Sequence, residues 1–69
     1  MKYNYSKLLG RMKECGITQE QLAKALDKDV STLSAKFNNK SQFKAEEMDA
    51  ICKVLDISNE EIGAYFFAV

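Results

Sequence analysis

The sequence predicts an all-α fold of five short helices. Its 69 residues include no proline and only three glycines, so few positions force the chain out of a helix. Apolar residues recur throughout at the i, i+3, i+4, i+7 spacing of amphipathic helices. A chain of this length buries only about 60% of its extended surface. We therefore expect one compact domain over residues 1–69.

The first predicted helix spans about residues 5–15. Its apolar stripe consists of Tyr5, Leu8, Leu9 and Met12. Asn4 is the expected N-cap, because its side chain accepts hydrogen bonds from free N–H groups, and Gly16 suits a left-handed end. Gly10 lies inside this helix, where glycine costs up to about 1 kcal/mol against alanine. It suggests that a neighbouring helix approaches closely there.

The second predicted helix spans residues 19–26. Thr18 and Gln21 have the spacing of a capping box, in which each side chain bonds the backbone N–H of the other residue. The apolar face of this helix consists of Leu22, Ala23 and Leu26.

The third predicted helix spans residues 30–38. Asp27 precedes it and tolerates a left-handed turn better than most residues other than glycine, and Asp29 is the expected N-cap. Leu33 and Phe37 form its buried face. A polar loop follows, behind which Phe43 is expected to fill the core.

Two further helices are predicted over residues 45–55 and 59–67. The first has a weak start, because Lys44 stands where a capping oxygen is expected, and it is expected to bury Met48, Ile51, Cys52 and Leu55. Ser58 and Glu61 have the spacing of a second capping box, which would open the last helix.

Composition argues against several functions. The chain has no histidine, the commonest metal ligand and general base. Cys15 and Cys52 are too few for a zinc motif or a disulfide framework, and we expect both to be buried free thiols. No apolar run approaches the roughly 20 residues that span a bilayer. We expect a soluble cytoplasmic protein that is not an enzyme and holds no metal or cofactor.

A formal net charge of zero hides an asymmetry along the chain. Residues 1–44 carry nine basic and four acidic groups, a net charge of +5, and residues 45–69 carry one basic and six acidic groups, a net charge of −5. The basic part of the chain could face a polyanion such as DNA.

The segments 19–26 and 30–38, joined by a short turn, have the pattern of a helix-turn-helix unit. Ala23 is small enough for close crossing of two helices. The inward positions that would hold the corner are Leu22, Leu26 and Leu33.

These segments resemble the phage repressor group of helix-turn-helix proteins, the Cro and CI type. The resemblance covers nearly the whole chain and includes Thr-Gln-x-x-Leu-Ala from Thr18, Thr-Leu-Ser from Thr32, and the tail Ile62–Phe67. It implies a lambda-repressor-like, five-helix domain, a transcriptional regulator that places helix 30–38 in the major groove of a pseudo-palindromic double-stranded operator. Asp27 replaces the turn glycine of the family, and Lys28 replaces an apolar residue, so its stem must snorkel outward.

A helical wheel with a rotation of about 100° per residue orients helix 30–38. With Leu33 and Phe37 inward, the residues most nearly opposite are Ser31, Ala35 and Asn38, with Thr32 and Asn39 beside them and Ser34 and Lys36 on the flanks. Val30 lies close to the buried side, at the start of the helix. The family resemblance nominates Val30, Ser31 and Ala35 for base contact and Gln19 for phosphate contact.

Residues after this helix are expected to hold phosphates. They are Asn38, Asn39, Lys40 and Ser41, with Lys36 and Lys28 as further candidates. The small and apolar groups on the helix itself suit thymine methyls and one or two hydrogen bonds. No glutamine or arginine stands in the middle of the helix for a bidentate base contact, so DNA shape is expected to share in specificity.

The last five residues, Tyr65–Val69, carry more apolar surface than one helical face can bury, and they are called the tail from here on. Phe67 and Val69 either fold back onto the first helix or form an exposed patch, which would serve a weak homodimer. The alternative function is a protein-interaction module on the same fold, such as an antirepressor that binds through the acidic part of the chain or the tail.

Overall fold

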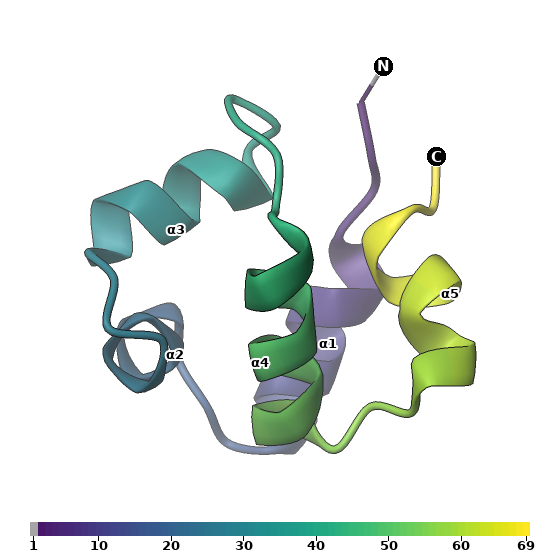
Figure 1. The fold of residues 1–69 in the computed structure, drawn as a ribbon, viewed down its shortest axis with the longest axis horizontal. Coiled ribbons are helices and arrows are strands. Elements are labelled where there is room, and N and C mark those ends of the chain that lie inside the picture. Colours follow the sequence, from purple (N-terminus) through teal and green to yellow (C-terminus); the bar gives the residue numbers. More distant parts are fainter. Residues whose placement is uncertain (1) are drawn as a thin grey trace.

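A computed structural model describes residues 2–69, and each regular element in that range is helical (Figure 1). The elements are α1 (Ser6–Glu14), α2 (Gln19–Ala25), α3 (Val30–Phe37), α4 (Ala45–Leu55), the 3-10 turn η1 (Asn59–Glu61) and α5 (Ile62–Phe66). The all-α prediction is confirmed for these residues, and the predicted bounds of the first four helices hold to within one residue at each end.

The start of α1 uses the side chain of Asn4, which accepts a hydrogen bond from the N–H of Ser6 at 2.9 Å. Tyr5, rather than Asn4, holds the N-cap position itself. A methyl group built at Gly10 would meet no atom within 4 Å. The prediction of a close neighbour at Gly10 is therefore wrong.

Each of the first four helices is followed, within two residues of its end, by a residue with a left-handed backbone conformation. Gly16, Asp27, Asn39 and Asp56 have φ angles of 67°, 56°, 62° and 55°. The residue after each bonds back across the last turn, as the Ile17 N–H does to the Met12 carbonyl at 2.9 Å. Only the first of these four residues is glycine, so Asp27 performs the role expected of it.

Capping differs between the helix starts. The Thr18–Gln21 box is confirmed, with bonds of 2.9 and 3.1 Å between side chain and backbone. Asp29 occupies the N-cap of α3, but its side chain makes no capping hydrogen bond. The box predicted at Ser58 does not form, because the Ser58 hydroxyl bonds the Glu61 carboxylate at 3.0 Å. The predicted helix 59–67 is accordingly a 3-10 turn followed by a short α5.

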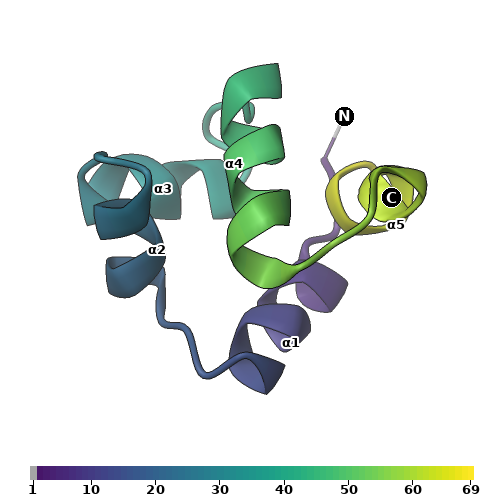
Figure 2. The same ribbon diagram turned by 60° about the horizontal axis from the view of Figure 1, so that its bottom comes forward.

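The core lies where α4 packs between the α2–α3 pair and α5, with α1 behind α4 in Figure 1 and below it in Figure 2. Its largest fully buried side chains are Phe66, Leu8, Leu22, Leu33, Ile51 and Leu55. Phe43 is buried as predicted, and its ring lies edge to face with three others, those of Tyr5, Phe37 and Phe66, at 5.3–5.5 Å between centroids. Such pairs contribute about 0.5–1.5 kcal/mol each beyond the area they bury.

The segment before α1 and the segment after α5 lie side by side (Figure 1). The Asn4 N–H donates to the Ala68 carbonyl at 2.6 Å, and the rings of Tyr3 and Phe67 meet edge to face at 5.6 Å. Within the tail, Phe67 and Ala68 thus fold back onto residues 3 and 4, while α5, which contains Tyr65, contacts α1. Phe67 nevertheless stays 48% exposed and Val69 83% exposed.

The two cysteines differ in exposure. Cys52 is buried as expected, whereas Cys15 is exposed, so the prediction of a buried thiol there is wrong.

No helix within residues 2–69 has the length and apolar character needed to cross a membrane.

Candidate functional site

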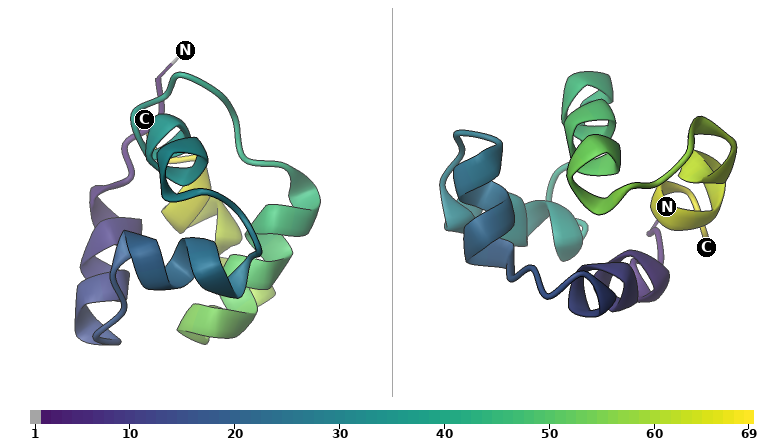
Figure 3. Two further views of the ribbon diagram at one scale, coloured as in Figure 1. Left: turned by 90° about the vertical axis from the view of Figure 1, so that its left-hand side faces the viewer. Right: turned by 90° about the horizontal axis from the view of Figure 1, so that it is seen from below.

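Helix α3 presents one face to the protein and the other to solvent. Its buried residues are Leu33, Lys36 and Phe37, while Val30, Ser31 and Thr32 are exposed. Val30, at the first position, is 45% exposed. The left panel of Figure 3 shows α3 end-on above α2, which runs across the view, so the two helices cross at a steep angle. The N-terminal turn of α3 is therefore an open polar and apolar surface.

The sequence-predicted residues on and around α3 divide into exposed and partly covered groups. The exposed ones are Lys28, Val30, Ser31, Thr32, Asn38, Lys40 and Ser41. The half-buried ones are Gln19, Ser34, Ala35 and Asn39. The remaining predicted residue, Lys36, is buried.

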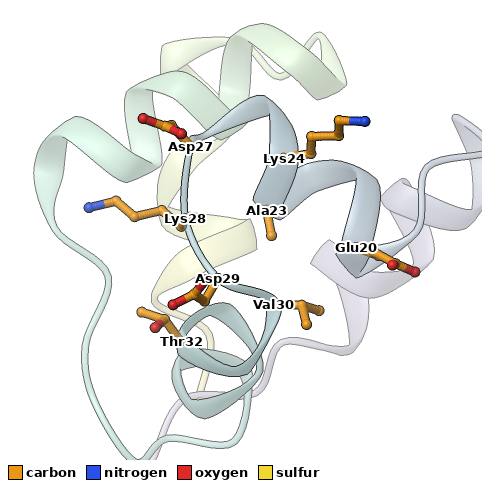
Figure 4. A pocket seen from close by; sticks show the side chains of 8 residues that line it. All are labelled: Glu20, Ala23, Lys24, Asp27, Lys28, Asp29, Val30 and Thr32. Atoms are coloured by element: carbon orange, nitrogen blue, oxygen red, sulfur yellow. The ribbon is translucent and has the colours of Figure 1, made fainter.

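A shallow hollow lies at the corner of α2 and α3 (Figure 4). It is lined by Glu20, Ala23, Lys24, Asp27, Lys28, Asp29, Val30 and Thr32. Figure 4 shows Ala23 pointing from α2 toward α3, while Lys24 and Lys28 point to opposite sides. With three carboxylates and two ammonium groups, the hollow is not basic, so the positive excess of residues 1–44 is not concentrated there.

Lys36 does not face solvent. Its side chain is 8% exposed, and its ammonium donates to both carboxylate oxygens of Glu47 on α4. The structure therefore contradicts the prediction that Lys36 contacts DNA phosphate. On the helical wheel Lys36 lies on a flank of the buried face, and this flank is the one against which α4 packs.

Glu47 has three cationic or N–H partners. Besides Lys36, it accepts the backbone N–H of Lys44 at 2.7 Å, and Lys28 Nζ lies 3.9 Å from its Oε2. Burial acts to raise the pKa of Glu47, but the hydrogen bonds from Lys36 and Lys44 and the charges of Lys36 and Lys28 together hold it below its ordinary value. Glu47 is therefore ionised at neutral pH.

The contact to Lys44 also explains the start of α4. An ammonium group has no acceptor, so Lys44 cannot cap the helix with its side chain. Glu47, at the third helical position, supplies the reciprocal half of a capping box by bonding the Lys44 N–H. The spacing between Lys44 and Glu47 was the only sequence signal that could have singled out Glu47.

The two asparagines after α3 have local and long-range partners. The Asn38 Nδ2 donates to the Ser34 carbonyl at 2.9 Å, which closes the last turn of α3. The Asn39 amide bonds both backbone groups of Tyr3, at 2.8 and 2.9 Å. Asn39 thereby anchors the N-terminal segment, and its role as a phosphate ligand stays a prediction. Sequence reasoning gave no signal for this contact across 36 residues.

The described residues 2–69 contain no group of three or more cysteine, aspartate or glutamate side chains arranged to hold a metal ion. The chain matches, over residues 1–69, a family model described as "Protein of unknown function (DUF739)". No curated protein matches it.

Proposed function

The chain belongs to the DUF739 family, and we propose that it is a sequence-specific, double-stranded DNA-binding transcriptional regulator. In this proposal α2 and α3 form a helix-turn-helix within a lambda-repressor-like domain, and α3 is the recognition helix. The observation that carries the proposal is the exposed N-terminal turn of α3, held in place by a buried opposite face.

The dimensions of α3 support this assignment. An α-helix is about 10–12 Å across with its side chains, so the major groove, about 12 Å wide, admits one. The eight residues of α3 make it about 12 Å long. In helix-turn-helix proteins the N-terminal residues of the second helix contact the base edges. Here those residues are Val30, Ser31 and Thr32, all exposed.

The chemistry of these three residues suits thymine-containing sites. Val30 and the methyl group of Thr32 can contact a thymine methyl, and the hydroxyls of Ser31 and Thr32 can bond base edges as donor or acceptor. None of them makes a bidentate base contact. Part of the specificity therefore comes from the shape and deformability of the DNA.

Phosphate contacts come from residues on either side of α3. Lys28 precedes the helix and Lys40 follows it, and both are exposed. Ser41 and Asn38 lie beside Lys40, and Gln19 begins α2. Because each neutralised phosphate releases counterions, each contact adds about −0.9 to the slope of log K against log salt. Because few lysines are available for phosphate contacts, we expect a shallow slope of log K against log salt.

A pseudo-palindromic operator requires two copies of the domain, one for each half-site. Phe67 and Val69 leave apolar surface exposed at the tail, which supports a weak homodimer. As a repressor of the phage Cro and CI type, the protein would act in the bacterial cytoplasm.

The first test is a selection of random duplex DNA by the purified chain at about 100 mM salt, where phosphate contacts alone bind weakly. The expected result is an enriched palindrome whose half-sites lie about one helical turn apart. Folded protein that enriches no sequence would refute the proposal and favour a protein partner.

Three variants then sort the contacts. Lys40→Ala should weaken binding to all duplexes and flatten the salt slope by about one unit. Ser31→Ala should change which duplexes are preferred. Lys53→Ala is the matched control, because Lys53 is an exposed lysine on α4 that pairs with Asp49 at 3.3 Å. Equal effects of the first two variants would contradict this division of roles.

A further inference from the structure

One carboxylate connects both ends of α3 to the start of α4. Glu47 binds Lys36, in the last turn of α3, through both oxygens. Lys28, two residues before α3 begins, places its ammonium 3.9 Å from Oε2 of the same carboxylate. The Lys44 N–H, at the start of α4, donates to Oε1 at 2.7 Å.

The Lys36–Glu47 pair is nearly dry, with side chains only 8% and 6% exposed. Replacing a buried ion pair by apolar residues of similar volume is often neutral or stabilising. Stability alone therefore gives no reason for charged groups at these positions. A property that apolar side chains lack is direction: hydrophobic contact is non-directional, whereas a charge-assisted hydrogen bond fixes distance and angle.

Direction matters most on α3. Its apolar anchors, Leu33 and Phe37, are buried on one side of the helix, and their contacts alone leave small rotations of α3 weakly restrained. Lys36 hydrogen-bonds Glu47 on the flank of α3 that faces α4, and this pair resists the roll, while the Lys28 ammonium lies 3.9 Å from the same carboxylate. Because neighbouring residues of a helix lie about 100° apart, even a partial roll would change which side chains of the first turn are exposed.

We infer that Glu47 is a positioning residue: through Lys36 and Lys28 it fixes the rotation of α3 against α4 and so determines which side chains α3 presents. The rotation itself is a property of the isolated chain. Its consequence for base recognition rests on the proposed function.

The first arm of the test needs no DNA. The double variant Lys36→Met/Glu47→Met removes the buried ion pair at nearly constant volume. The matched control is Asp49→Met/Lys53→Met, which removes an exposed ion pair within α4. Residual dipolar couplings of backbone amides report the orientation of α3 relative to α4. We expect the double variant to keep its helices but to lose the wild-type orientation of α3, and the control to keep it.

Couplings in the double variant that fit the wild-type orientation of α3 would overturn the inference. If this variant does not fold, Glu47→Gln is measured instead, because it keeps the shape of the side chain and removes its charge. Couplings in Glu47→Gln that fit the wild-type orientation of α3 would likewise overturn the inference. Lys36→Arg is the rescue, because it keeps a charged donor at the position. It should retain the wild-type orientation, and a reorientation like that of the double variant would also contradict the role assigned to the pair.

The second arm uses the duplex that the wild-type chain selects from a random pool. Affinity for this duplex is compared with affinity for versions changed at one base pair, where a mismatch typically costs a factor of about 5 to 150. The double variant should lose most of this ratio at positions read by α3, while the slope of log K against log salt, which depends on Lys28 and Lys40, should not become shallower. An unchanged ratio would refute the role of Glu47 in recognition. If the wild-type chain selects no duplex, the proposed function fails, and the first arm still decides whether Glu47 holds α3.

Discussion

Removing Lys36 alone should destabilise the domain severely. In Lys36→Met the carboxylate of Glu47 stays buried and keeps only the Lys44 N–H, at 2.7 Å, and the Lys28 ammonium, at 3.9 Å. Breaking a buried ion pair in this way costs about 3–5 kcal/mol. Because two partners remain, we expect the lower end, about 3 kcal/mol. The free energy of unfolding of the whole domain is only about 3–10 kcal/mol, at about 0.05–0.15 kcal/mol per residue.

Thermal unfolding followed by circular dichroism measures this loss. At about 4–8 °C per kcal/mol for a small domain, the midpoint should fall by about 12–24 °C. The double variant Lys36→Met/Glu47→Met should recover most of the loss, because no unpaired charge remains. Lys53→Met, at a side chain that is 77% exposed, should change stability by less than about 0.5 kcal/mol.

The pH dependence distinguishes a stranded carboxylate from simple loss of packing. In the wild-type chain the pKa of Glu47 lies below its ordinary 4.5, so its contribution to stability is full above pH 4.5 and is lost as pH falls through the lower value. In Lys36→Met we expect burial to outweigh the remaining partners and to raise the pKa of Glu47, so that stability is instead gained on acidification. The destabilisation should therefore shrink between pH 7 and pH 4.5. A loss below about 1 kcal/mol, or one independent of pH, would refute this account of the pair.

Three further results are expected. Gly10→Ala should raise the free energy of unfolding by up to about 1 kcal/mol in urea titrations, because the added methyl group meets no atom within 4 Å, and a loss would contradict an open site there. Asn39→Gly keeps the left-handed backbone but removes two bonds to Tyr3, so stability should fall by about 1–3 kcal/mol and the amide of Tyr3 should exchange faster; unchanged exchange would argue against the anchor. A thiol reagent should label Cys15 in the native protein and Cys52 only on unfolding, because burial, together with the charge of Asp49, raises the pKa of Cys52; equal rates would contradict their different exposure.

Helix positions were predictable because their signals are local. The Thr18–Gln21 box and the left-handed residues Gly16 and Asp27 act within three or four residues of the ends they set. The same reasoning failed at Ser58, where the two side chains of the expected box bond each other instead of the backbone. A local sequence pattern shows which donors and acceptors are available near a helix end, but it does not determine which of them form hydrogen bonds with each other.

The errors at the candidate site have a different origin. The wheel located the inward face of α3 correctly from Leu33 and Phe37, yet it could not tell which flank α4 would cover. Lys36 lies on that flank, eleven residues from its partner, and Asn39 lies 36 residues from Tyr3. No periodicity encodes such pairs, because tertiary packing creates them.

These contacts change the meaning of the charge asymmetry along the chain. Of the nine basic groups in residues 1–44, Lys36 and Lys28 face Glu47, the Arg11 Nε donates to the Leu55 carbonyl at 2.9 Å, and the Lys7 ammonium lies 4.9 Å from the centre of the Tyr65 ring. Part of the positive excess thus holds the acidic C-terminal helices to the rest of the domain instead of forming an external field. A regulator built this way would depend on the fit of α3 in the groove more than on long-range attraction. The affinity of such a regulator should then be modest and only weakly salt-dependent, and its selectivity would depend on how firmly Glu47 holds α3.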